Sequence, residues 1–345
     1  MKDKKIFLIN LIYYIAMLLV AVIFVLGTAG FLQSDFLATF LIQIVVVAGV
    51  PIIMYSLFVT KSIKQTFFNF GFKKLSTKLV LLSFAVGIVL YLLNIFVADS
   101  FATFIVLLGY ETTIPTLSVS YSGMLVDFLL TACLPGLCEE ILHRGLVLNG
   151  CKKEGYTRYG LIISSILFGL LHLNILQFFY ATILGFCIGL SVLATESIWT
   201  GIICHFTNNF LSVYFSYDTG LPIQRFYYFI FSKIINLPPI ILIGFFAGAM
   251  LGLIYLFKYL LKVIKKQKLK EAINKLTIEL NLDNLDSIEA ENKVNEVNEL
   301  LKNLNNPQNN IKDKKRLGFV DNLFLICSVI LGSVATIFTF ITGIL

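Results

Sequence analysis

The stretch Leu129–Leu148, LLTACLPGLCEEILHRGLVL, is long and apolar enough to cross a bilayer, yet it holds two adjacent glutamates, a histidine and an arginine. Apolar runs of about 18 or more residues recur along most of the chain. Hydrophobic residues make up 58% of the 345 residues and charged residues 14%, and the mean hydropathy is +0.87. About a quarter of the residues of a soluble domain are charged. The composition therefore excludes a soluble globular domain and predicts an integral membrane protein.

The chain contains about nine apolar segments of this kind. Because a backbone inside lipid must satisfy its own hydrogen bonds, we expect each segment to be helical. The predicted fold is all-α: a polytopic transmembrane bundle of about eight or nine helices, with a cavity in the membrane and a cytoplasmic helical insert. The first segment is too long for the core of a signal peptide, so we expect it to be retained. The predicted segments are 6–30, 36–60, 79–99, 123–150, 159–173, 175–195, 197–216, 237–261 and 321–344.

Two neighbouring segments, 159–173 and 175–195, are separated only by a short turn near Asn174. The first of them is also short. Whether both segments span the membrane fully stays open at this point.

The net charge of +7 resides mainly in Lys and Arg clusters between apolar segments, where basic residues set the orientation in the membrane. We therefore expect no nucleic-acid partner. The basic clusters alternate with a loop that carries Asp99 and Glu111 but no Lys or Arg. One alternating topology satisfies the clusters, with Arg225 and Lys233 as exceptions on the outer side. It predicts a multi-pass protein of the cell membrane with a cytoplasmic N-terminus.

Residues 265–316 differ from the rest because they are polar, Asn-rich and charged. Leu269 and Ile273 recur at helical spacing, as do Val297 and Leu301. We predict a cytoplasmic helical hairpin between the last two spans. Two interpretations of it remain open: a solvated insert, and a docking element that binds a partner or self-associates.

Charged side chains near the centre of a membrane helix cost about 2.5–3.5 kcal/mol, so they usually face a cavity or one another. Glu140 and Arg144 are four residues apart on one helix face and can form an ion pair. Glu139 points about 100° away and is left out of that pair. His143 follows Glu139 by four residues and can pair with it, but we assign it no role. The ionisable residues of the middle segments include every histidine of the chain; they are Glu139, Glu140, His143, Arg144, His172 and His205.

A helical rise of about 1.5 Å per residue puts Glu139, His172 and His205 at similar depth on separate helices of the predicted topology. In a low-dielectric cavity, a carboxylate beside a histidine can hold and deprotonate a water molecule. His205 and Asn209 share a helix face and offer hydrogen-bond donors to a developing oxyanion. This set suits the addition of water to a carbonyl, as in peptide hydrolysis. Zinc also accepts two histidines and a glutamate as catalytic ligands, so a zinc site at Glu139, His172 and His205 stays open.

Three short motifs carry a family resemblance. EEILHR at 139–144 fits Glu-Glu-x-x-x-Arg, FGLLH at 168–172 fits Phe-x-x-x-His, and HFTNN at 205–209 fits His-x-x-x-Asn. In this order and spacing they resemble the signature motifs of the CAAX prenyl protease and bacteriocin-processing family of intramembrane proteases, also called the CPBP or Abi family. The resemblance covers residues 123–217.

The resemblance implies an all-helical core whose membrane cavity is reached from the cytosolic side. It implies that Glu139 and His172 activate water, and that His205 and Asn209 bind the oxyanion. We therefore expect an intramembrane endopeptidase that hydrolyses peptide bonds of membrane-associated peptide or protein substrates.

Glu140, Arg144 and Phe168 are the supporting residues that the resemblance implies, ordering the site around the catalytic groups. A glutamate mechanism needs no metal, so we favour no cofactor and keep a zinc-dependent protease as an alternative.

Other functions remain open. Bacterial members of the family are linked to bacteriocin immunity, so a non-cleaving immunity or membrane scaffold protein with the same fold is one alternative. A transporter with a Glu and His proton relay is disfavoured, because the chain shows no evident internal repeat. The predicted organisation comprises N-terminal transmembrane helices at 1–120, the catalytic core at 121–217, a transmembrane helix at 218–264, the hairpin insert at 265–316 and a C-terminal transmembrane helix at 317–345.

Overall fold

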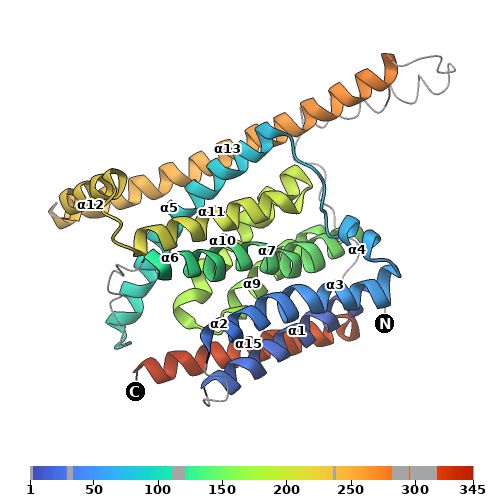
Figure 1. Cartoon of the computed structure of the whole chain (residues 1–345), viewed down its shortest axis with the longest axis horizontal. Coiled ribbons are helices and arrows are strands. Elements are labelled where there is room, and N and C mark those ends of the chain that lie inside the picture. Colours follow the sequence, from blue (N-terminus) through green and yellow to red (C-terminus); the bar gives the residue numbers. More distant parts are fainter. Residues whose placement is uncertain are drawn as a thin grey trace.

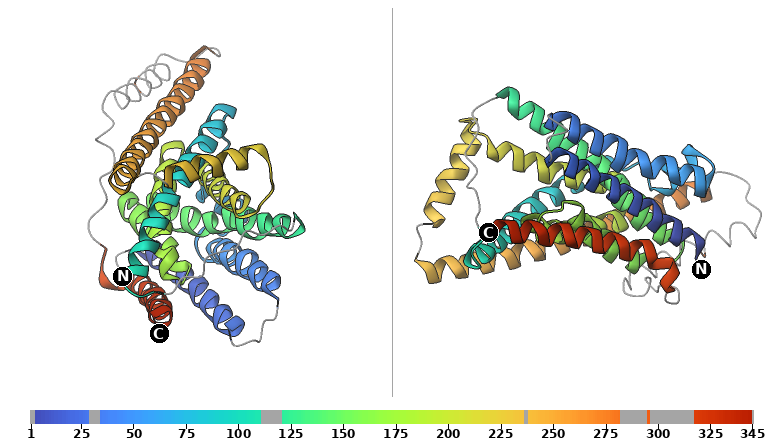
Figure 2. Two further views of the ribbon diagram at one scale, coloured as in Figure 1. Left: turned by 90° about the vertical axis from the view of Figure 1, so that its left-hand side faces the viewer. Right: turned by 90° about the horizontal axis from the view of Figure 1, so that it is seen from below.

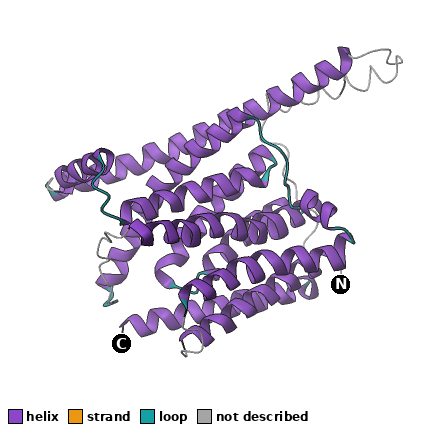
Figure 3. Ribbon diagram, in the orientation of Figure 1, coloured by secondary structure: helices purple, strands orange, loops and turns teal. Residues whose placement is uncertain are grey.

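The structure, a computed structural model, describes residues 3–28, 34–110, 121–235, 238–281, 295 and 317–344. Within these ranges the chain folds into helices and their connections, with no β-strand (Figure 3). The predicted all-α fold is confirmed.

Among the described residues, six helices are long and apolar enough to cross a membrane. Thr157–Leu171 is also apolar but shorter. The chain is thus a multi-pass membrane protein, as the sequence predicts. The six spans are Lys4–Gly27, Phe36–Thr60, Thr77–Leu107, Ile175–Thr195, Gly244–Lys275 and Phe319–Thr342.

The N-terminal part consists of α1 and a continuous helical segment that alternates between α and π geometry, followed by two further helices. Ser62 and Ser76 accept hydrogen bonds in the first turns of those two helices and so fix where each begins. The elements are α1 (Lys4–Thr28), α2 (Asp35–Phe40), the π-helical η1 (Leu41–Gly49), α3 (Val50–Tyr55), the π-helical η2 (Ser56–Thr60), α4 (Ile63–Asn69) and α5 (Thr77–Leu107).

A second continuous segment carries the paired glutamates, which end its central α-helical part. π-Helical turns are rare and frequently occur at functional sites. Here they flank the glutamates on both sides. The segment consists of α6 (Tyr121–Asp127), the π-helical η3 (Phe128–Cys133), α7 (Leu134–Glu140), the π-helical η4 (Ile141–Asn149) and α8 (Gly150–Lys153).

Three helices follow: α9 (Thr157–Leu171), α10 (Ile175–Thr195) and α11 (Ile198–Ser216). The turn predicted near Asn174 separates the first two. Leu173 there has a left-handed φ of 51°, and the Asn174 side chain accepts a hydrogen bond from the backbone N–H of Leu176 at 2.8 Å. This reversal brings α9 and α10 together along their length.

The C-terminal part consists of α12 (Pro222–Ile235), α13 (Pro239–Asn281) and α15 (Phe319–Ile344). The sequence analysis did not predict α12, because a helix of this length is too short to be recognised as a span. Helix α13 runs without interruption through the expected start of the insert at residue 265 and projects beyond the bundle (Figure 1). The predicted second helix of the hairpin, with Val297 and Leu301, lies outside the described residues.

Two apolar cores hold the bundle together. One joins α1, η1, η4, α9 and α15, and the other joins α5, α10, α11 and α13. The first and last helices, α1 and α15, lie side by side at one edge (Figures 1 and 2). Helix α9 contributes to both cores, with Leu167 in the first and Phe168 in the second. The motif helices therefore occupy the centre of the molecule.

Ion pairs gather at the end of the bundle where the basic loops lie. Lys5 contacts Glu154 at 2.9 Å, while Lys152 and Lys73 contact Glu196 at 3.0 and 3.8 Å. The pKa of Glu196 is lowered: partial burial raises it, but the ammonium groups of Lys152 and Lys73 outweigh that effect. Basic residues far apart in sequence thus meet on the side that the charge pattern assigns to the cytoplasm.

Candidate active site

Glu140 and Arg144 form the predicted ion pair, and both side chains are fully buried. Arg144 Nη1 donates to Glu140 Oε1 at 2.8 Å, and Nη2 donates to the backbone oxygen of Gly185 at 2.9 Å. The guanidinium carbon lies 4.6 Å from the centre of the Phe168 ring. The cation is therefore held by α7, α9 and α10 together.

Small residues let α11 come close to α7. A Cβ on Gly201 would lie 2.5 Å from Glu140 Oε2, and a Cβ on Gly136 would lie 3.2 Å from the backbone of Phe206. Glycine at these positions therefore gives the carboxylate and the neighbouring helix their space. Pro135, next to Gly136, lines the cavity described below.

Glu139 is separate from this ion pair, as its position on the helix predicts. Its side chain is 7% exposed, and Oε1 accepts a hydrogen bond from Gln43 Nε2 at 2.9 Å. Oε2 accepts no hydrogen bond from the described part of the chain. One oxygen of the carboxylate is thus held, and the other is buried without a hydrogen-bond partner in the described chain.

His172 and Phe168 lie at the end of α9. His172 Nδ1 is 2.8 Å from the backbone oxygen of Phe168, so Nδ1 carries the hydrogen and Nε2 is left as an acceptor. The Phe168 ring lies 5.3 Å from the rings of both His172 and His205, and 5.0 Å from that of His143. Phe168 therefore packs at the centre of the three histidines.

His205 connects two of the motifs. Its Nδ1 donates to Glu140 Oε1 at 3.0 Å, and its Nε2 lies 3.2 Å from Asn209 Nδ2. Asn209 Nδ2 also donates to the backbone oxygen of Thr131 at 2.8 Å. With Nδ1 protonated, Nε2 of a neutral His205 accepts from Asn209.

His143 does not pair with the Glu139 carboxylate. Its Nδ1 donates instead to the backbone oxygen of Glu139 at 2.8 Å, and its Nε2 lies 3.2 Å from the Tyr13 hydroxyl. The His143 ring extends toward α1, where Tyr13 lies. His143 therefore links the Glu139 backbone to the N-terminal helix.

A cavity of about 310 Å³ brings the predicted catalytic residues together. Glu139, His172, His205 and Asn209 all line it, and they come from three different helical segments. The supporting Phe168 also lines it. Glu140 and Arg144 are not among the described residues that line the cavity. Glu140 contacts His205, which does line it.

Several polar lining residues escaped the sequence analysis. Asn208 is 3% exposed and donates to Asn209 Oδ1 at 2.8 Å, while its own Oδ1 has no partner in the described chain. Neutral polar residues inside apolar runs are the signal for them, and of this kind the sequence analysis singled out only Asn209. The other missed polar lining residues are Asn94, Thr131, Gln177, Tyr180 and Ser212.

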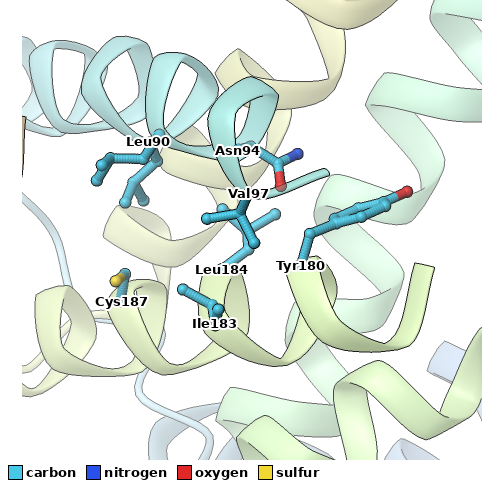
Figure 4. A pocket seen from close by; sticks show the side chains of 8 residues that line it. Leu90, Asn94, Val97, Tyr180, Ile183, Leu184 and Cys187 are labelled. Atoms are coloured by element: carbon cyan, nitrogen blue, oxygen red, sulfur yellow. The ribbon is translucent and has the colours of Figure 1, made fainter. Parts of the chain in front are cut away.

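An apolar groove between α5 and α10 adjoins this cavity (Figure 4). The two share Asn94, Tyr180 and Leu184. The polar cavity therefore borders a groove lined mainly by aliphatic side chains.

The residues do not fit a zinc ion as they are arranged. Among the described residues, no three His, Cys, Asp or Glu side chains converge on a point that could hold a metal. Both ring nitrogens of His205 already have partners, Glu140 and Asn209. The alternative zinc set of Glu139, His172 and His205 would need His205 to give up one of them.

Residues 121–211 match the family model of the type II CAAX prenyl endopeptidase Rce1-like proteins. This segment is Rce1-like. The resemblance inferred from the three motifs is thereby confirmed, and at family level the Rce1-like segment indicates a CAAX-type intramembrane protease. Neither a curated protein nor a solved structure matches the chain. The Rce1-like segment contains α6 to α10 and most of α11, and thus all three motifs.

Proposed function

We propose that the chain is an intramembrane endopeptidase that cleaves membrane-associated peptides or proteins. The observation that carries the proposal is the shared cavity of Glu139, His172, His205 and Asn209 within the Rce1-like segment. A carboxylate and an imidazole that line one cavity suit general-base activation of water.

Glu139 and His172 orient the attacking water. The Glu139 carboxylate and His172 Nε2 are both acceptors, so one water molecule donates a hydrogen to each and points a lone pair at the scissile carbonyl. Glu139 then takes the proton while the water oxygen bonds to the carbonyl carbon. The electron pair of the C=O bond moves to the carbonyl oxygen and forms the oxyanion.

His205 and Asn209 stabilise that oxyanion. The Asn209 amide hydrogen that now points to His205 Nε2 can turn to the oxyanion, as donors in an oxyanion site do. His205 holds the Asn209 amide through Nε2 at 3.2 Å and is itself anchored through Nδ1 to Glu140 Oε1 at 3.0 Å.

Collapse of the tetrahedral carbon completes the reaction. The C–N bond breaks, its electron pair goes to nitrogen, and the proton held by Glu139 is delivered to the departing amine. The products are a carboxylic acid and an amine, and Glu139 returns to its starting state. These steps use side chains alone, in line with the poor fit of the site to zinc, so we propose that no metal takes part.

Position in the membrane limits the substrate class. The cavity lies among apolar spans and adjoins an apolar groove, which favours a peptide with an apolar anchor. The gathering of Lys5, Lys73 and Lys152 at one end supports a cytoplasmic N-terminus in the cell membrane.

A comparison of membrane peptides from cells tests this function. Cells with Glu139→Gln are expected to accumulate uncleaved substrate that is absent from cells with the wild type or with Glu196→Gln. The Glu196 variant is the matched control, because this glutamate lies at the surface away from the cavity. An identical peptide pattern in all three would favour a non-cleaving immunity or scaffold protein.

A further inference from the structure

Gln43 is a polar residue in an apolar span, and it contacts Glu139 from outside the Rce1-like segment. It lies in η1, is 7% exposed, and donates through Nε2 to Glu139 Oε1 at 2.9 Å. η1 packs directly against α7, which ends at the glutamates. The contact therefore joins the N-terminal spans to the reaction centre.

Stability alone does not account for a glutamine here. A buried amide is costly unless both of its polar ends are bonded, and Gln43 Oε1 has no hydrogen-bond partner in the described chain. An apolar side chain at this position would avoid that unpaired oxygen. What the glutamine supplies is one hydrogen bond, and it goes to Glu139.

That bond makes the two oxygens of Glu139 unequal. Oε1 shares its electron density with Gln43, whereas Oε2 has no partner in the described chain. A carboxylate held on one oxygen also keeps its plane fixed, so the other oxygen stays aimed in one direction. A general base needs such a fixed orientation, because catalytic groups must be held close to their productive geometry.

We propose that Gln43 is a positioning residue, which holds Glu139 Oε1 and so fixes the carboxylate that takes the proton of the attacking water. The inference rests on the proposed function, because it assigns Glu139 as the base. Gln43 is not among the described residues that line the cavity, so we assign it an effect through Glu139 rather than through a contact with substrate. Its loss is therefore expected to change kcat and leave KM nearly unchanged.

The test uses the full chain, purified and reconstituted in liposomes with a panel of lipid-anchored, quenched fluorogenic peptides that includes a prenylated C-a-a-X peptide. Gln43→Met removes the hydrogen-bond donor at similar side-chain volume. Gln43→His supplies a donor again, because a ring nitrogen of histidine reaches about as far as the glutamine amide nitrogen. Ser56→Ala is the matched control, because it removes a buried 2.8 Å hydrogen bond to Thr66 in the same helical segment without touching Glu139.

Gln43→Met is expected to lower kcat roughly 10- to 100-fold with KM within about twofold, the range for losing a hydrogen bond to a charged group. Gln43→His is expected to recover most of kcat, and Ser56→Ala to keep it. If Gln43→Met does not fold, Gln43→Asn replaces it, because its amide is one methylene short of Glu139. We then expect Gln43→Asn to fall well below Gln43→His.

Two results distinguish a failure of the role of Gln43 from a failure of the proposed function. Wild-type kcat in Gln43→Met, or equal kcat in Gln43→Asn and Gln43→His, overturns the role of Gln43 if Glu139→Gln is inactive in the same assay. Wild-type kcat in Glu139→Gln overturns the proposed function itself, whatever the Gln43 variants do.

Discussion

Glu140 Oε1 lies 3.0 Å from His205 Nδ1 and so ties α7 to α11 by a buried charged hydrogen bond. The same oxygen accepts from Arg144. Glu140 therefore joins the first motif to the third through these two hydrogen bonds. Glu139, in contrast, lines the cavity.

The Glu140–Arg144 pair is expected to be strongly coupled. Glu140→Leu leaves a buried guanidinium without its anion, and breaking a buried pair from one side costs about 3–5 kcal/mol. The double variant Glu140→Leu/Arg144→Met is expected to cost clearly less than the two single variants combined. Unfolding in detergent micelles measures all three. Additive losses would contradict a coupled pair.

Gly201→Ala is expected to destabilise the protein and lower its activity. The new methyl group would lie 2.5 Å from Glu140 Oε2 and 2.9 Å from a Val192 methyl carbon, so the buried carboxylate or the helix backbones must shift. Overpacking of this kind costs about 1–3 kcal/mol. Gly248→Ala on α13 is the matched control, because its Cβ would meet nothing within 4 Å. Equal melting temperatures for the two variants would argue against the close approach of α7 and α11.

Asn209→Ala is expected to reduce kcat about 10²- to 10³-fold, as does the loss of one donor in an oxyanion site. Initial rates against the lipid-anchored peptide panel measure the effect. Asn69→Ala serves as the control, because that asparagine is a partly exposed residue at the end of α4 and is not among the described residues that line the cavity. A rate close to that of the wild type for Asn209→Ala would remove it from the oxyanion site.

Metal removal is expected to leave the activity unchanged. Both ring nitrogens of His205 are engaged by Glu140 and Asn209, so the site does not offer three ligands to zinc. Dialysis against a chelator, followed by elemental analysis and rate measurement on the same sample, tests this. Stoichiometric zinc together with loss of activity on its removal would support a zinc-dependent protease.

The sequence predicted the helical fold and the residues that share the cavity, because both signals are local. Apolar length defines a span. The spacing of Glu140 and Arg144 sets one face of a helix, and the scarcity of ionisable groups in the spans marked Glu139 and His172. These features do not depend on how distant helices pack.

The contacts that the sequence did not predict depend on that packing. Gln43 reaches Glu139 across 96 positions of the chain, and no local pattern encodes which helix faces which. The contacts of His143 with Tyr13 and with the backbone oxygen of Glu139 were likewise not predicted, because the contact with Tyr13 depends on how α1 packs. The roles of Glu139, His172, His205 and Asn209 stay predictions, and Glu139→Gln and Asn209→Ala test those of Glu139 and Asn209.

The most direct test is the cleavage of the lipid-anchored peptide panel by reconstituted wild-type protein and by Glu139→Gln. The variant keeps the shape of the side chain but cannot accept a proton. We expect the wild type to cleave and Glu139→Gln to lose at least about 100-fold in kcat, the contribution of a general base, while its unfolding temperature stays near that of the wild type. Cleavage at the wild-type rate by Glu139→Gln, or no cleavage of any peptide by the wild type, would contradict the account.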